Sequence, residues 1–136
     1  MASKLTGFKT SVPPGSPADR LDGEPIDHAY LGRFTQGNAD LEREVLGLFA
    51  DMIPRYLDDL RAATSNKGWK DATHTIKGSA AAVGARRLAR FAEMAERLDV
   101  EAPEACTEGY RDEAISALAA AADEACRHIV RRFARV

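Results

Sequence analysis

The feature that most constrains the fold is a long series of apolar residues at helical spacing in the first half of the chain. Over several turns they recur every three or four positions: Leu41, Val45, Leu48, Phe49, Met52, Ile53, Tyr56, Leu57 and Leu60. We therefore expect a helix over about 38–65, bent near Ala50–Pro54 because the proline removes one backbone hydrogen bond. No segment of the chain alternates with period two, which argues against β-strands.

Similar patterns predict the remaining helices. They are expected at about 68–83, 85–99 and 109–134, with a loop at 100–108 and a short helix at 25–34. The last helix repeats its apolar residues at alternating three- and four-residue steps, as in a bundle seam. The predicted fold is therefore all-α, an antiparallel four-helix bundle with a short additional N-terminal helix.

Composition indicates one globular domain without a strong net charge. The chain has 136 residues, and 45% of them are hydrophobic, which is enough for a single core. Its formal net charge of −2 argues against a general nucleic-acid-binding surface. The Pro- and Gly-rich start predicts a disordered tail over 1–25 and a folded domain over 26–136. We expect neither a signal peptide nor a membrane span, because the apolar runs are far shorter than about 18 residues.

The cysteines and two of the three histidines give no sign of a metal site. Cys106 and Cys126 have neither metal-ligand spacing nor a disulfide framework, so we expect a reducing cytoplasm and no bound metal. Cys126 and His128 are two residues apart and should point to nearly opposite sides of a helix. His28 and His128 are interpreted as surface residues without a role.

The helix predicted at 68–83 has two chemically different faces. Its apolar positions form a stripe roughly 80° wide that should be buried: Trp69, Ala72, Ile76, Ala80 and Val83. A second face carries Lys70, His74, Lys77, Gly78 and Ala81. The His74 imidazole is therefore expected to point to solvent, with a lysine on either side.

Gly78 is the unusual residue of this second face. It follows His74 by four positions, so one turn of helix separates the two on the same side. A glycine inside a helix costs around 1 kcal/mol relative to alanine, and we expect that another molecule has to approach the ring closely. Lys77 and Lys70 would neutralise an anion attached to a ring nitrogen.

The run His74-Thr75-Ile76-Lys77-Gly78-Ser79, followed by Val83-Gly84-Ala85 and Leu88, resembles the signature of histidine-containing phosphotransfer (HPt) domains. These are helical phosphorelay intermediates of multi-step two-component signalling. The resemblance covers most of residues 38–99. It implies that His74 is the phosphoacceptor, that Lys77 neutralises the phosphate, and that Gly78 opens the approach. Lys70 is expected to add to the neutralisation because it lies on the same face. Asp71 and Ala81 are expected to belong to the access and partner surface.

By this resemblance the chain would accept a phosphoryl group from one receiver-domain aspartate and pass it to another. Its partners would be the receiver domains of a hybrid histidine kinase and of a response regulator. We expect a cytoplasmic monomer with no cofactor, no metal of its own, no contact with nucleic acid or membrane, and no autonomous kinase activity.

Three other classes of protein could carry such a helix. In a helical adaptor His74 would be incidental, and the face with Lys70, Lys77 and Gly78 would bind a protein without chemistry. A histidine-kinase dimerisation domain resembles this pattern too, but it would carry an acidic residue where Thr75 stands. An acid–base enzyme is disfavoured because the sequence fixes no second titratable group beside His74 and predicts no water-excluding pocket.

Overall fold

The computed structural model describes residues 24–134, and within that range it contains helices and turns but no strand. The tail predicted at 1–25 lies almost wholly outside the described residues. The helices are α2 (His28–Thr35), α3 (Ala39–Ala62), α4 (Asn66–Val83), α5 (Arg86–Glu96), α6 (Glu104–Thr107) and α7 (Tyr110–Ala134). Among the described residues, no helix combines the length and the apolar character needed to span a membrane.

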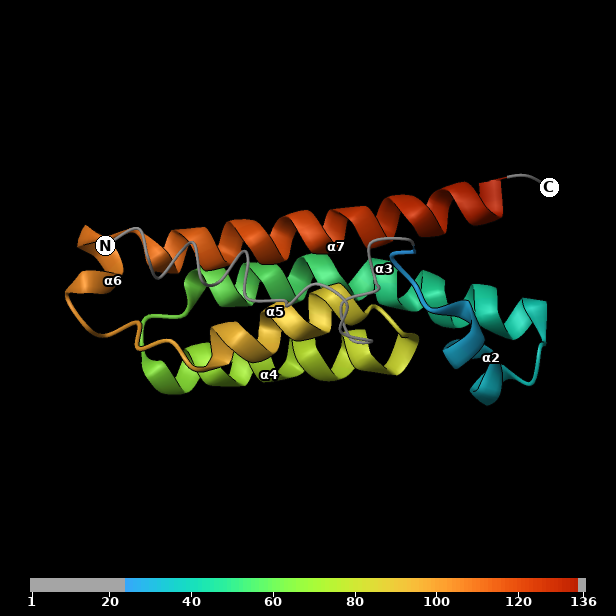
Figure 1. Ribbon diagram of the computed structural model, residues 1–136, viewed down its shortest axis with the longest axis horizontal. Helices are drawn as coiled ribbons and strands as arrows, with labels where there is room; N and C mark the ends of the chain where they lie inside the picture. Colours follow the sequence, from blue (N-terminus) through green and yellow to red (C-terminus); the bar gives the residue numbers. More distant parts are fainter. Residues whose placement is uncertain (1–23, 135–136) are drawn as a thin grey trace, which may run out of the picture.

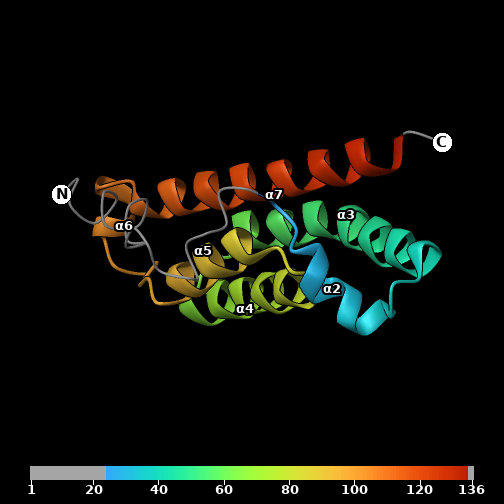
Figure 2. The ribbon, with the colours of Figure 1, turned by 45° about the vertical axis from the view of Figure 1, so that its right-hand side comes forward.

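Four of these helices form an antiparallel bundle. In Figure 1 α3 and α5 run in one direction, and α4 and α7 run in the other. α3 packs against α4, α4 against α5, α5 against α7, and α7 against α3, which closes the bundle around one core. The short helix α2 lies at the end where α4 turns into α5, and it contacts α3 and α4 (Figure 2). The predicted fold class is confirmed.

Side chains at the helix starts explain most of the boundaries. Asp27, Asn38 and Ser65 precede α2, α3 and α4, and each accepts a hydrogen bond from a backbone N–H three residues later. These bonds satisfy N–H groups that have no partner within the helix. Gln36, with a φ of 54°, ends α2 in the left-handed conformation.

Gly84 ends α4 as expected, and its surroundings show why no other residue fits there. Its φ is +80°, and a Cβ at this position would lie 2.9 Å from the backbone oxygen of Asp27. The Asp27 amide also donates to the Gly84 carbonyl at 2.9 Å. This close approach fixes the segment before α2 against the turn between α4 and α5.

Several predicted boundaries were wrong by a few residues. α3 ends at Ala62 and not near 65, because the chain is extended at Ala63 before Ser65 caps the next helix. α5 ends at Glu96 and not at 99. The Asn66 side chain accepts from the Val100 amide and donates to Asp99, and these bonds hold the chain after α5 in a non-helical path. The bend predicted in α3 near Pro54 stays a prediction.

The predicted loop at 100–108 contains a further short helix, α6. Its four residues begin after Pro103, a position that suits proline because its missing N–H is not needed in a first turn. Ala105 is buried, and α6 packs against α7. One turn of helix lacks a periodic pattern, so the sequence did not distinguish it from a loop.

Trp69 anchors α4 in the core. The side chain is fully buried, and its indole N–H donates to the Ala95 carbonyl of α5 at 2.7 Å. Ala95 is itself fully buried, and its small side chain lets α5 come close to the indole. The Arg111 guanidinium of α7 lies 5.5 Å from the center of the indole ring. The other residues of the predicted stripe on α4 are also buried, which leaves the opposite face of this helix outside.

Candidate functional site

His74 lies in the middle of α4 on its outer face, as predicted. Its side chain is 70% exposed, and its Nδ1 lies 3.5 Å from Oε2 of Glu96 on α5. The neighbouring Thr73 is fully buried and donates its hydroxyl to the Trp69 carbonyl at 2.9 Å. The backbone below the imidazole is therefore fixed to the core, while the ring itself is open to solvent.

Lys77 reaches the same carboxylate from the next turn of α4. Its Nζ lies 3.3 Å from Oε1 of Glu96, and 32% of its side chain is exposed. Glu96 thus offers one oxygen to His74 and the other to Lys77. Its own side chain is only 27% exposed, which places the carboxylate at the junction of α4 and α5.

Gly78 is exposed, and the fold does not require a glycine there. A Cβ at this position would meet nothing within 4 Å, and the backbone is part of the regular helix α4. In contrast to Gly84, no close contact explains the residue. The helix therefore carries an internal glycine penalty on the same face as His74, one turn away.

The remaining predicted residues of this face differ in their contacts. Lys70 and Ala81 are exposed, as expected from their positions on α4. The Asp71 carboxylate contacts the Lys67 ammonium at 2.9 Å, and both side chains are largely exposed. Asp71 is thus on the surface, but its charge is partly compensated within α4.

Sequence reasoning missed Glu96. Nothing in the local pattern links it to a histidine 22 positions earlier. Its role in the site depends on the packing of α5 against α4, which the helical period does not specify. The only signal in the sequence is the charge of Glu96, which is opposite to that of Lys77 on the preceding helix.

A hollow of ≈510 Å³ lies beside this face. Lys77 and Ala81 of α4 form one wall, and Arg86, Ala89, Arg90 and Glu93 of α5 form another, with Tyr30 and Gly84 at the end. The hollow is open to solvent and carries three basic side chains against one acidic side chain. Lys77 and Arg86 are ion-paired with Glu96 and Asp27, so the depression on the α5 side of the His74 face has a basic lining whose charge is partly compensated.

The family described as "Hpt domain" matches residues 44–128, a region that begins in α3 and ends in α7. Searches of curated proteins and of solved structures gave no match. The matched region covers more than half of the chain and includes His74, Lys77, Gly78 and Glu96. The chain therefore belongs to the Hpt domain family.

Proposed function

We propose that this protein is a phosphorelay intermediate that carries a phosphoryl group on His74. The observation that supports it best is an exposed imidazole on a rigid helix, next to a glycine that packing does not require. Membership of the Hpt domain family favours histidine phosphotransfer as the type of chemistry. Hpt domains generally act without kinase activity, and we propose the same for this chain.

The ring nitrogen that reacts is proposed to be Nε2. A carboxylate facing Nδ1 favours the tautomer that carries its proton on Nδ1, which leaves a lone pair on Nε2. This lone pair would attack the phosphorus of a receiver aspartyl phosphate. The new N–P bond forms as the P–O bond to aspartate breaks, and the electron pair of that bond stays on the released carboxylate. Return of the phosphoryl group to a second aspartate reverses these steps.

Lys77 is proposed to change partner during transfer. Its ammonium contacts Glu96 in the structure, and a phosphoryl group on Nε2 would offer close to two negative charges nearby. At a partly exposed site such an attraction is worth at most about 1 kcal/mol. Lys70 would contribute less, because it has no packing that directs it toward the ring. Glu96 therefore competes with the phosphoryl group for Lys77.

We further propose that the receiver docks on the face of α4 that carries Gly78 and Ala81. The adjacent hollow, with Lys77, Arg86 and Arg90 in its walls, suits a partner whose contacting surface is acidic. The Mg²⁺ needed for transfer would be held by the acidic site of the receiver, so the chain itself would need no metal at His74.

Label transfer from a phosphorylated receiver tests this function. Receiver domains charged with radiolabelled phosphate are mixed with wild type, His74→Gln, His28→Gln and His128→Gln. We expect label on wild type and on the last two variants but not on His74→Gln, and we expect no label from ATP alone. Equal labelling of His74→Gln, with its fold intact by circular dichroism, would contradict the assignment. An absence of label on every variant with every receiver of the cell would favour the adaptor.

A further inference from the structure

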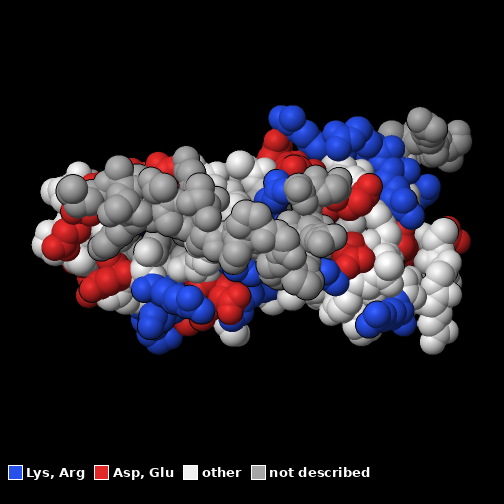
Figure 3. All heavy atoms as spheres, viewed as in Figure 1, with Lys and Arg blue, Asp and Glu red and all other residues white. Residues whose placement is uncertain are grey.

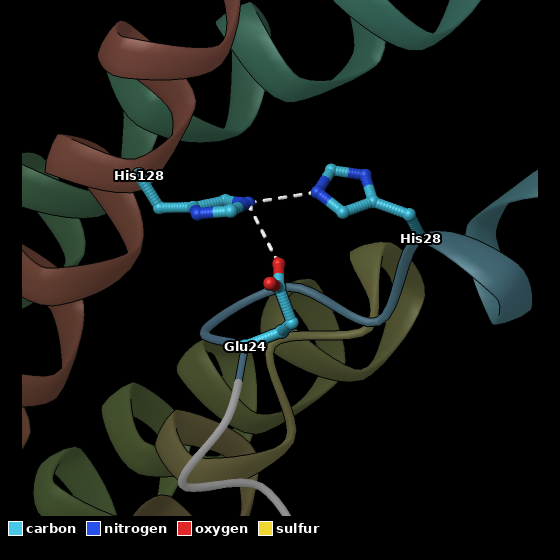
Figure 4. A group of neighbouring side chains, drawn as sticks. All are labelled: Glu24, His28 and His128. Carbon is cyan, nitrogen blue, oxygen red and sulfur yellow. Dashed lines mark hydrogen bonds and ion pairs between the residues drawn. The ribbon is translucent and has the colours of Figure 1, made fainter.

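We propose that Glu24, His28 and His128 form a binding site for Zn²⁺. This site is formed by the segment before α2, by α2 and by α7, not by α4, and it uses the two histidines for which the sequence predicted no role. Glu24 and His28 flank the segment that leads into α2, and His128 lies near the end of α7, one hundred residues after His28. Figure 4 shows the three side chains converging on one point between these elements.

The positions of the donor atoms suit a small cation. The two Nε2 atoms are 2.8 Å apart, and a Glu24 carboxylate oxygen lies 3.6 Å from Nε2 of His128. All three donor atoms lie within 4.8 Å of one another. Tetrahedral zinc with ligand bonds of about 2.0–2.2 Å separates neighbouring donors by roughly 3.3 Å. Small movements of the side chains would therefore complete a His₂Glu set, with a fourth position for water.

Glu42 provides the support that a zinc-binding histidine requires. Its carboxylate lies 3.6 Å from Nδ1 of His28, and its side chain is only 12% exposed. Nδ1 is buried and has no hydrogen-bond partner at this distance. A proton on Nδ1 would face the carboxylate and leave the Nε2 lone pair for the metal, which is the usual arrangement around zinc-bound imidazoles. A modest rotation of the ring on metal binding would then form this hydrogen bond.

The local charges permit a cation despite the basic side chains nearby. Figure 3 shows Lys and Arg gathered over the last turns of α7, and Arg131 and Arg132 line an open pocket of ≈400 Å³ together with Glu24 and His128. The Arg132 guanidinium is bound to Glu42 at 3.1 Å, which offsets its charge. Burial, and after it the charge of Arg132, lowers the pKa of His28.

Without a metal, the two imidazoles share a single proton between their Nε2 atoms. One ring must donate and the other accept, because two lone pairs or two N–H groups at 2.8 Å would repel. Zn²⁺ would take the position of this proton, which would move through solvent to Nδ1 of His128 so that both rings stay neutral, and the metal would tie the segment before α2 to α7. These elements are far apart in the sequence, so the metal would hold together the end of the bundle where α2 packs.

Titration of the full chain with Zn²⁺, prepared without a polyhistidine tag, tests the site. We expect one Zn²⁺ per chain with a micromolar or lower Kd by calorimetry, and an absorption spectrum of tetrahedral coordination with Co²⁺. His28→Gln and His128→Gln should each lose this binding. Glu24→Gln alters an exposed side chain and should weaken Zn²⁺ binding by about tenfold or more. The chain contains three histidines, and His74→Gln serves as the matched control that keeps full affinity.

Thermal unfolding supplies a second readout. Free Zn²⁺ at about 100 times the Kd should raise the Tm of wild type and of His74→Gln by roughly 5–10 °C. His28→Gln and His128→Gln, with wild-type circular dichroism spectra, should show no such rise. Binding only in the millimolar range, or equal affinity in wild type and His28→Gln, would overturn the proposal. Loss of binding in His74→Gln alone would place the metal elsewhere and overturn it too.

Discussion

Substitution of Gly78 should raise stability and lower activity together. Because a Cβ at this position would meet nothing within 4 Å, Gly78→Ala removes the glycine penalty without creating a clash. The gain should be close to 1 kcal/mol, which for a chain of this size raises the Tm by about 3–5 °C. Glutamine has a helix propensity near that of alanine, so Gly78→Gln should keep most of the gain.

The expected slowing of phosphoryl transfer follows from the space that a docked receiver needs above the His74 imidazole. A docked receiver would have to confine a glutamine side chain at Gly78, which costs about 1.5–2 kcal/mol of side-chain entropy, whereas alanine costs nothing. Transfer to Gly78→Gln should therefore slow by roughly 10- to 30-fold, and transfer to Gly78→Ala should slow much less. The steric contact of the larger side chain with the receiver can only add to this difference.

The assay measures transfer rates from one phosphorylated receiver by rapid quench, together with thermal melts of the same samples. Ala120→Gln is the matched control, because it adds the same side chain at an exposed position of α7, across the bundle from α4. It should transfer at the wild-type rate. A Gly78→Gln protein that melts no lower than wild type and still transfers at the wild-type rate would refute the access role of Gly78.

Three other substitutions test the account at separate points. Lys77→Ala should slow phosphoryl transfer up to about fivefold at low salt and less at high salt. Glu96→Gln keeps an acceptor for Nδ1 of His74 but frees Lys77, so it should raise the phosphorylated fraction at equilibrium. A wild-type transfer rate in the first variant and a wild-type phosphorylated fraction in the second would contradict the exchange of partners by Lys77. Gly84→Ala should lower the free energy of unfolding by at least about 2 kcal/mol, because Gly84 has a positive φ and the new Cβ would lie 2.9 Å from the backbone oxygen of Asp27. Urea melts measure this, and an unchanged midpoint of the urea transition would contradict it. Trp69→Phe removes the indole hydrogen bond to Ala95, whose carbonyl keeps the Leu98 amide as a donor, and leaves a small cavity in the core. It should lower the free energy of unfolding by about 1.5–3 kcal/mol, measured by circular dichroism since the only Trp is lost; a loss under about 0.5 kcal/mol would show that the indole contributes little.

The parts of the fold that depend on local pattern were predictable. The helical spacing of apolar residues predicted α3, α4, α5 and α7. Each of these helices buries one face, so its apolar residues recur every three or four positions over several turns. The helices predicted at 25–34 and 68–83 end close to the observed positions, where Gln36, Gly37 and Gly84 have positive φ angles. The exposed position of His74 also followed from the helical wheel alone.

Contacts between distant segments were not predictable from the same patterns. Glu96 joins His74 and Lys77 only because α5 packs against α4 at one particular rotation. His28 and His128 meet because α2 folds over the end of the bundle, and their separation of one hundred residues hid the pair. Side-chain caps such as Ser65 shifted the helix boundaries, since one hydrogen bond decides where the first turn begins.

Nε2 of His74 is proposed to carry the phosphoryl group. Mass spectrometry of the chain after reaction with a phosphorylated receiver, combined with ³¹P–¹⁵N NMR of histidine-labelled protein, measures this directly. We predict one phosphoryl group, on the His74 peptide and bonded to Nε2, that is lost when an unphosphorylated receiver and Mg²⁺ are added. A phosphoryl group on Ser79 or Thr75, or one on His74 that no receiver can remove, would contradict the account.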